Sequence, residues 1–175
     1  NLDRLRFIDQ IHKGRIITLM SDRLTLEQRV READVVIGSV LVPGARAPKL
    51  VTEDMIRSMR TGAVAIDIAI DQGGCMETSR MTTHSDPTYV VDGVVHYCVG
   101  NMPGAVPNTS TYALTNVTLP FALQIATRGL EEAARADAAL AIGVNVIAGE
   151  VTNPGVAEAH TMRFTPLSAI VDGLS

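Results

Sequence analysis

A buried strand that ends in two glycines constrains the fold of this chain most. Residues 63–70 are apolar except for Asp67, a pattern typical of a strand that is covered on both faces. Gly73 and Gly74 follow and predict the end of the strand. In an open parallel sheet, ligands bind outside the carboxyl ends of the strands. We therefore expect Asp71, the carboxylate at this strand end, to lie in the functional site.

Helices and strands are predicted to alternate along the first hundred residues. Apolar residues recur at helical spacing over residues 2–13, 24–33 and 52–59, and short apolar runs over residues 15–20 and 34–40 predict strands. Two further runs, residues 88–91 and 94–99, flank Asp92-Gly93, which is a typical hairpin turn. This alternation predicts an α/β fold with a mostly parallel sheet.

The rest of the chain is predicted to be helical. Possible N-caps at residues 108–110 begin a long helix that runs to Arg128 and stops at Gly129. An alanine-rich helix is expected over residues 130–142, and a short one over residues 144–152. Because no strand follows, this part is expected to pack away from the sheet, with the boundary near residues 104–109.

Composition excludes several classes of function. The 175 residues, 46% hydrophobic, suffice for one globular domain or one domain with an appendage. A net charge of -4 without a basic cluster argues against nucleic acid as a partner, and no apolar run reaches the roughly 18 residues that cross a membrane. Cys75 and Cys98 are interpreted as free thiols in a cytoplasmic protein. The histidine and cysteine spacings predict no metal site.

Three polar residues near strand ends could carry chemistry. Asp67 is interpreted as a structural carboxylate held by backbone donors, with a ligand contact as the alternative. Asp71 is interpreted as a ligand contact, with a structural role as the alternative, because the two glycines after it leave room for a ligand. Asn101 offers a donor and an acceptor at the next strand end, or it forms an Asx turn before Pro103; both interpretations stay open.

The chain lacks the GxGxxG fingerprint that seats a dinucleotide pyrophosphate on a helix N-terminus. It also opens at Asn1 directly on a helical pattern, so we expect it to be the second part of a longer protein. With the strand order 3-2-1-4-5-6, residues 15–20 would lie beyond two absent strands and would not pair with residues 34–40. Arg4 would then lie beside an adenosine ribose; a solvated position on the helix is the alternative.

Four ordered motifs resemble the alanine dehydrogenase and transhydrogenase family, and most closely its bacterial alanine dehydrogenases. The resemblance runs in register from Asn1 to about residue 140, and the motifs are residues 38–51, 67–75, 97–103 and 109–116. It implies NAD-dependent oxidative deamination of L-alanine to pyruvate and ammonia, with the reverse amination, in a homo-oligomer that is a hexamer in the family. It also implies a Rossmann-like doubly wound parallel sheet in an NAD-binding domain, residues 1–108, that lacks its first two strands. Residues 109–175 become a helical C-terminal segment that packs on the substrate domain.

The resemblance also assigns roles to individual residues. Asp71 matches the active-site aspartate of the family. The expected cofactor contacts are Arg4 and Ser21 on the adenosine side, Val40 and Leu41 along the dinucleotide, and Ile68, Ala69, Ile70, Asp71, Val99, Gly100, Asn101 and Met102 on the nicotinamide side. The family's substrate-binding half, with its carboxylate-binding cations and catalytic histidine, has no counterpart in the chain.

Two alternatives remain at this stage. One is the NAD-binding subunit of proton-translocating transhydrogenase, which shares the segment Pro43 to Leu50. That subunit typically carries an amide where this chain has Asp71, because exchange of hydride between nucleotides needs no acid-base group there. The other is a non-catalytic remnant that binds a nucleotide or serves assembly. Asp71 favours alanine dehydrogenase, and we expect the chain alone not to oxidise alanine.

Overall fold

The computed structural model describes residues 1–171, which divide into two compact units. Asn1–Val40 and Pro48–Gly100 form the first unit. Leu41–Ala47 and the chain from Asn101 onward form the second, so a loop that lies early in the sequence belongs to the later unit. Each unit is described by itself below.

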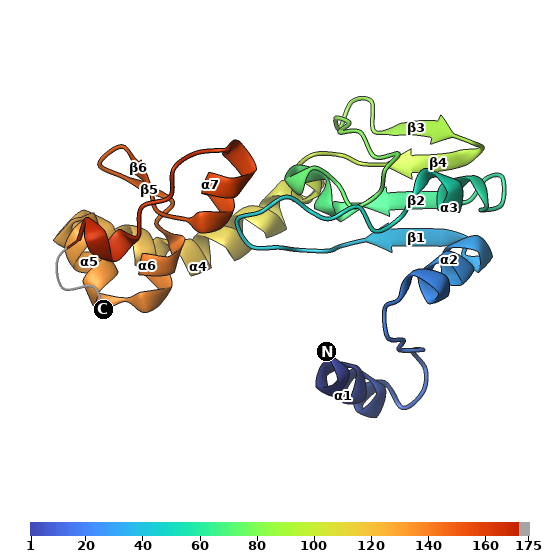
Figure 1. Ribbon diagram of the computed structural model, residues 1–175, viewed down its shortest axis with the longest axis horizontal. Coiled ribbons are helices and arrows are strands. Elements are labelled where there is room, and N and C mark those ends of the chain that lie inside the picture. The colour runs from blue at the N-terminus through green and yellow to red at the C-terminus, as the bar shows by residue number, and fades with distance from the viewer. Residues whose placement is uncertain (172–175) are drawn as a thin grey trace. The chain divides into compact units, whose positions relative to one another are not determined.

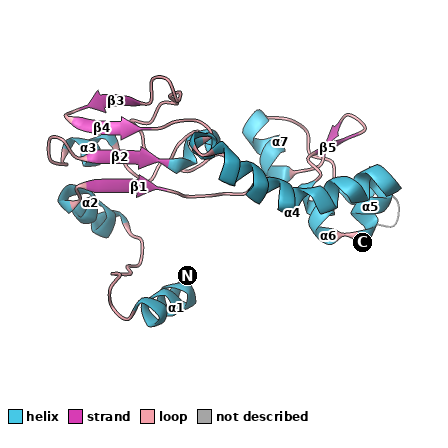
Figure 2. Ribbon diagram, turned by 180° about the vertical axis from the view of Figure 1, so that it is seen from behind, coloured by secondary structure: helices cyan, strands magenta, loops and turns pink. Residues whose placement is uncertain are grey.

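The first unit contains a four-stranded sheet in the order β1-β2-β4-β3 (Figures 1 and 2). Its strands are β1 (Val35–Gly38), β2 (Val64–Asp67), β3 (Thr88–Val91) and β4 (Val94–Tyr97). β1 pairs with β2 and β2 with β4 in parallel, whereas β3 and β4 form an antiparallel hairpin. The predicted α/β class and the mostly parallel sheet are confirmed.

The hairpin forms at Asp92-Gly93, as its sequence predicts. Asp92 and Gly93 have φ of 49° and 80°, and Val91 pairs directly with Val94. Two central residues with positive φ match the right-handed twist of the strands that they join.

Three helices accompany the sheet: α1 (Leu2–His12), α2 (Arg23–Glu32) and α3 (Glu53–Arg57). Asp22 caps α2 by accepting the backbone N–H of Thr25 at 2.9 Å, and Thr52 caps α3. The best-buried apolar side chains come from α3, the sheet and the segments that follow its strands: Ile56, Ala65, Met76, Val94, Cys98 and Val99, each 0% exposed. The core of this unit is therefore shared by α3, the sheet and the segments that follow its strands.

Two strand predictions in this unit are wrong. Residues 15–20 form no strand, and β1 pairs only with β2. An apolar run becomes a strand only when another strand completes its hydrogen bonds, and no described strand pairs with this one. β2 also ends at Asp67 rather than at residue 70, and Ile68–Gln72 form the 3-10 helix η1. The expectation that residues 15–20 do not pair with β1 holds.

In the second unit, η2 (Met102–Ala105) leads into the long helix α4 (Pro107–Arg128), with Pro107 in its first turn. The predicted long helix is confirmed. Residues 107–127 carry no charge, yet none of the side chains of α4 is buried. None of the helices formed by residues 1–171 is both long enough and apolar enough to cross a membrane.

The sequence after α4 differs from its prediction. The single helix expected over residues 130–142 is two helices, α5 (Leu130–Ala136) and α6 (Ala138–Gly143), because Asp137 between them accepts the N–H groups of Ala139 and Leu140. Residues 144–152 form no helix but the hairpin of β5 (Val146–Ile147) and β6 (Glu150–Val151). Its turn residues, Ala148 and Gly149, have φ of 52° and 82°, which an α-helix does not allow.

Helix α7 (Pro154–His160) and the 3-10 helix η3 (Leu167–Ala169) are the remaining elements in the described part of the second unit. The early loop packs against the start of α7. A Cβ on Gly155 would lie 2.7 Å from the carbonyl oxygen of Gly44, and a Cβ on Gly44 would lie 2.8 Å from Asn153 Oδ1. These two glycines therefore set how closely the early loop approaches α7.

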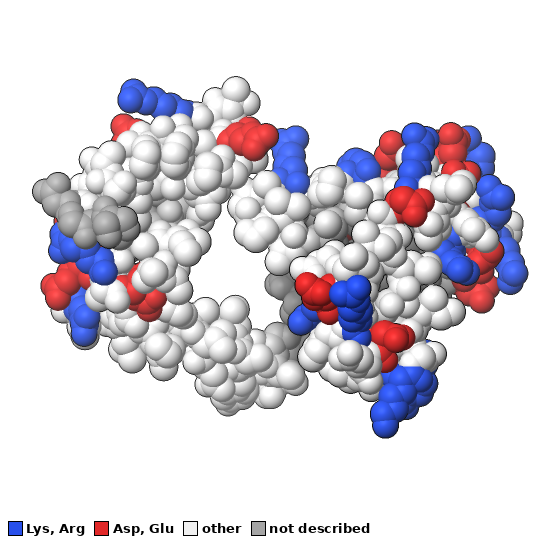
Figure 3. All heavy atoms as spheres, turned by 60° about the horizontal axis from the view of Figure 1, so that its bottom comes forward, with Lys and Arg blue, Asp and Glu red and all other residues white. Residues whose placement is uncertain are grey.

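Positively and negatively charged side chains are mixed on the surface. On the face shown in Figure 3, lysine and arginine lie interspersed with aspartate and glutamate. Several pair within one helix, as Arg57 does with Glu53 at 2.8 Å and with Asp54 at 2.9 Å. Exposed pairs of this kind contribute little to stability.

Candidate active site

The buried carboxylate of Asp67 organises the end of β2. Its side chain is 0% exposed. Oδ1 accepts the N–H of Ala69 at 3.1 Å, while Oδ2 accepts the N–H groups of Cys75 at 2.8 Å and Met76 at 3.1 Å and the hydroxyl of Ser79 at 2.6 Å. A buried charge is tolerated only when such donors replace water. The interpretation of Asp67 as a structural carboxylate is confirmed.

Two glycines allow the chain to close around this carboxylate. A Cβ on Gly74, whose φ is 75°, would lie 2.8 Å from Asp67 Oδ2. A Cβ on Gly38, at the end of β1, would overlap Cys75 Sγ. The thiol of Cys75 donates to Asp67 Oδ1 at 3.4 Å, and burial together with the negative charge of Asp67 raises the pKa of Cys75 to about 11. Cys75 therefore stays a neutral thiol, and both cysteines are free, as predicted.

Asp71 lies on η1, four residues beyond the end of β2, and is exposed. Its Oδ1 is 3.5 Å from the position that a Cβ on Gly100 would occupy, and Met81 Sδ is 3.1 Å from the same point. Gly100 follows β4, the parallel neighbour of β2. The carboxyl ends of two adjacent parallel strands thus bring a carboxylate against a glycine backbone, which is where open α/β sheets bind ligands.

The relation between the two aspartates differs from the prediction. The sequence predicts Asp67 within the strand and Asp71 at the end of the same strand. The strand ends at Asp67 because its own side chain bonds the N–H of Ala69 and turns the backbone into η1. Asp71 is therefore presented by a short 3-10 helix and not by a strand.

Lys49, which precedes α3 in the sequence, bonds the backbone that follows η1. Lys49 Nζ donates to the carbonyl oxygens of Gly73 at 2.8 Å and Met76 at 3.0 Å. Its charge therefore stabilises the turn that follows Asp71. The sequence placed Lys49 in a motif, but no local pattern connects it with residues 24 and 27 positions away.

The other predicted contacts in the first unit lie on separate elements. Arg4 is exposed on α1, where its guanidinium lies 5.6 Å from the ring centroid of Phe7. Ser21 precedes the N-cap of α2 and lines a pocket of about 540 Å³ together with Lys49 and Glu77. The remaining positions adjoin the strand ends: Val40 after β1, Ile68, Ala69 and Ile70 on η1, and Val99 after β4.

Three predicted residues belong to the second unit: Leu41, Asn101 and Met102. Leu41 is 72% exposed at the start of the early loop. Asn101 has φ of 53° and begins η2, but its side chain accepts no capping hydrogen bond there. Both interpretations of Asn101, a ligand contact and an Asx turn, stay predictions.

A buried histidine supports the segment between the two strand ends. His96, 0% exposed on β4, contacts Thr78 Oγ1 through Nε2 at 2.8 Å and the carbonyl of Val94 through Nδ1 at 3.0 Å. Tyr89 stacks on its ring with centroids 5.0 Å apart, and the guanidinium of Arg80 lies 4.0 Å from the centroid of Tyr89. Burial lowers the pKa of His96, so the ring is neutral at neutral pH.

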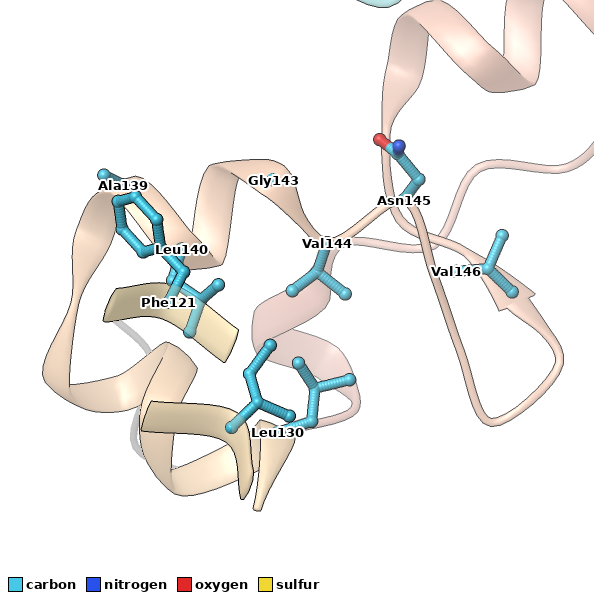
Figure 4. A pocket seen from close by; sticks show the side chains of 9 residues that line it. Phe121, Leu130, Ala139, Leu140, Gly143, Val144, Asn145 and Val146 are labelled. Carbon is cyan, nitrogen blue, oxygen red and sulfur yellow. The ribbon is translucent and has the colours of Figure 1, made fainter. Parts of the chain in front are cut away.

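A second pocket is formed within the second unit alone. In the second unit, about 570 Å³ of largely apolar space is bounded by residues of α4, α5, α6 and β5, including Phe121, Leu130, Leu140 and Val146 (Figure 4). It contains none of the predicted site residues. Within residues 1–171, no group of three histidine, cysteine or acidic side chains is placed to hold a metal ion.

The fold and the site together define a class: an α/β unit of the dinucleotide-binding type, with a carboxylate presented at the carboxyl ends of its parallel strands. Comparison with known proteins narrows this class. The family model described as "Alanine dehydrogenase/PNT, C-terminal domain" matches residues 1–154. The chain belongs to this family.

Relatives and a solved structure agree with this family. The chain is 55% identical over 170 residues to alanine dehydrogenase of Staphylococcus saprophyticus, covering 97% of this chain and 46% of that protein. It is 56% identical over 165 residues to alanine dehydrogenase 2 of Staphylococcus aureus, covering 94% and 44%. A solved L-alanine dehydrogenase superposes with a TM-score of 0.78 at 48% identity, covering 92% of this chain and 44% of that one. The chain thus spans less than half the length of these relatives.

Proposed function

We propose that this protein takes part in the NAD-dependent oxidative deamination of L-alanine to pyruvate and ammonia, and in the reverse amination. The observation that carries the proposal is the placement of Asp71 beside Gly100, at the carboxyl ends of two adjacent parallel strands. The relatives named alanine dehydrogenase support the substrate, since identity to them extends over 94–97% of the chain. The family and the exposed strand-end residues support NAD as the cofactor.

The residues near Asp71 suit a nicotinamide ring. Ile68 on η1 is 49% exposed and Met81 is 59% exposed, so apolar surface lies open beside the carboxylate. Gly100 adds no side chain where Asp71 approaches. We assign Ile68–Asp71 and Val99–Met102 to the nicotinamide side, and Val40, Leu41, Ser21 and Arg4 to the remainder of the dinucleotide. When bound there, NAD supplies the acceptor for the hydride that leaves the substrate.

Asp71 manages protons in this reaction. Loss of a hydride from Cα and of a proton from nitrogen converts alanine into the imine of pyruvate; water then adds and ammonia departs. Asp71 takes a proton from the attacking water and returns it to the departing nitrogen, a task that suits a positioned carboxylate at neutral pH. One alanine, one water and one NAD⁺ give pyruvate, ammonium, NADH and one proton.

Other groups are needed to hold the substrate. In the described part of the first unit, Lys49 is engaged by two backbone carbonyls and Arg80 lies over Tyr89, so neither is directed to a substrate carboxylate. We propose that the carboxylate-binding cations come from the portion of the relatives that this chain does not match. We also propose, from the family resemblance, that the assembled enzyme is a cytoplasmic homo-oligomer, a hexamer.

The test combines the chain with the preceding portion of the Staphylococcus saprophyticus relative. The two parts are expressed separately and mixed, and NADH formation from L-alanine and NAD is followed by absorbance. We expect NADH only when both parts are present, because positioning of the substrate needs groups from both. Comparable activity from the 175 residues alone would mean that the chemistry is misplaced.

Replacement of the carboxylate tests the role of Asp71. In the assembled enzyme, Asp71→Asn is expected to lower turnover by about two to four orders of magnitude, the usual contribution of a positioned acid-base group. The amide keeps the size of the side chain, so NAD binding measured by calorimetry should be retained. Asp86→Asn, at an exposed turn of the same unit, is the matched control and should leave turnover unchanged. Turnover of Asp71→Asn within a few-fold of the parent would contradict the proposal.

A further inference from the structure

We infer that Asp67 is a positioning residue, whose buried carboxylate holds both strand-end segments in the arrangement that places Asp71 beside Gly100. Asp67 is 0% exposed and so does not touch substrate or cofactor. Its influence on turnover is therefore exerted through Asp71 and rests on the proposed function. Its influence on the shape of η1 does not depend on that function.

The carboxylate ties together the two ends of the segment that carries Asp71. Oδ1 bonds the N–H of Ala69 at the start of η1, and Oδ2 bonds the N–H groups of Cys75 and Met76 after it. Asp71 therefore lies on a loop that is closed at both ends by one side chain. Closure of a short loop by fixed hydrogen bonds restricts the positions that its exposed residues can occupy.

A second set of bonds extends from the same carboxylate to Gly100. Ser79 Oγ donates to Oδ2 at 2.6 Å. The same Ser79 oxygen accepts a hydrogen bond from the thiol of Cys98 at 3.8 Å. Three residues after Ser79, Thr82 bonds the chain on both sides of Val99, since its N–H donates to the carbonyl of Cys98 at 3.0 Å and its carbonyl accepts from Gly100 at 3.2 Å. The segment around Ser79 thus links Asp67 to the end of β4.

The donors require a carboxylate and not an amide at this position. Oδ2 accepts three bonds, so an asparagine would keep its oxygen there and place its NH₂ group where Oδ1 stands. Of the two groups that face Oδ1, the thiol of Cys75 can turn to accept a proton, but the N–H of Ala69 can only donate. Asp67→Asn therefore breaks the bond at the start of η1 while it preserves those at the far end.

Hydrogen exchange tests the shape of η1 in the 175-residue chain itself. Asp67→Asn should accelerate amide exchange at residues 68–72 by tenfold or more, while exchange in β1 and β4 stays within about twofold of the parent. The matched control is Ser58→Ala, which removes a hydroxyl bond to the carbonyl of Met55 in the same unit, without a bond to η1 or to the segment around Ser79. Unchanged exchange at Ala69 in Asp67→Asn would overturn the inference.

Turnover tests the functional consequence in the assembled enzyme. Asp67→Asn should lower kcat per folded molecule by tenfold or more and displace the limb of the pH–rate profile that depends on Asp71. Ser58→Ala should leave both unchanged per folded molecule, because a general loss of stability changes amounts and not the profile. An active parent together with an Asp67→Asn variant of unaltered kcat and profile would refute the positioning role. A parent without activity would refute the proposed function instead, and the exchange measurement would still decide the role of Asp67.

A milder variant covers the case in which Asp67→Asn does not fold. Ser79→Ala removes one donor to Oδ2 and leaves the three backbone donors in place. It should lower kcat by about two- to fivefold with a displacement of the same limb. A Ser79→Ala enzyme with the parental profile would count against the inference.

Discussion

Adjacent glycines after η1 give a matched pair of substitutions that measures how tightly the chain closes on Asp67. Gly73 and Gly74 have φ of 91° and 75°, a region that alanine enters only with strain. A Cβ on Gly73 would meet no atom within 4 Å. A Cβ on Gly74 would lie 2.8 Å from Asp67 Oδ2 and 3.0 Å from Ser79 Cβ. The two alanine variants share the backbone cost and differ in the contact.

The expected costs follow from these contacts. A left-handed alanine costs roughly 1–2 kcal/mol, and the smaller freedom of its unfolded chain offsets about 0.4–1 kcal/mol of that. Gly73→Ala should therefore lower the free energy of unfolding by about 1 kcal/mol. Gly74→Ala adds an overpacked contact of about 1–3 kcal/mol, for a total of about 2–4 kcal/mol.

Cys98 provides the assay, because it is 0% exposed in the first unit and lies outside the glycine turn. The chain contains no tryptophan. Urea titrations read by pulsed alkylation of Cys98, with quantification of its peptide by mass spectrometry, give the free energy of unfolding of this unit by linear extrapolation. If Gly74→Ala fell within 0.5 kcal/mol of Gly73→Ala, the argument that Asp67 constrains this turn would be wrong.

Three further outcomes follow from single groups. Burial holds the pKa of His96 below 6.5, so the unfolded chain binds more protons at this residue than the folded chain does. Thermal stability should therefore fall as the pH decreases below about 6.5. The His96→Asn variant should show a weaker dependence of its melting temperature on pH in circular dichroism melts. Cys75, with a pKa of about 11, is thiolate in only about one molecule in a thousand at pH 8, so native chains should react with a disulfide reagent orders of magnitude more slowly than denatured ones. Asp137→Ala removes the cap of α6 and should lower the stability of the second unit by about 1 kcal/mol, measured by thermal melts.

Local patterns predicted the parts of the fold that depend on neighbours in sequence. The hairpin at Asp92-Gly93 and the end of α4 at Gly129 needed only turn and helix-stop residues. The end of β2 could not be predicted in the same way, because Ile68–Ile70 continue the apolar run and the bonds that hold Asp67 come partly from Cys75, Met76 and Ser79. The strand predicted over residues 15–20 failed because pattern gives no information about pairing partners.

The candidate site was likewise predictable only where it depends on residues that are neighbours in sequence. Asp71 could be placed near a strand end from the glycines that follow it, and the structure sets its carboxylate beside Gly100. The role of Ser79 carried no sequence signal, because a single serine in an irregular segment matches no motif. Groups that hold a site through long-range bonds are identified only once the chain is folded.

The early loop has a consequence for recombination between members of this family. Because Leu41–Ala47 belongs to the second unit, the boundary between the units crosses the chain at three places and not at one. A hybrid gene joined after Gly100 would combine the loop of one parent with the helices of the other. Gly44 and Gly155, which approach each other closely, would then come from different parents. Exchange of the second unit as a working module therefore requires three crossovers, so that the early loop is carried along with the later helices.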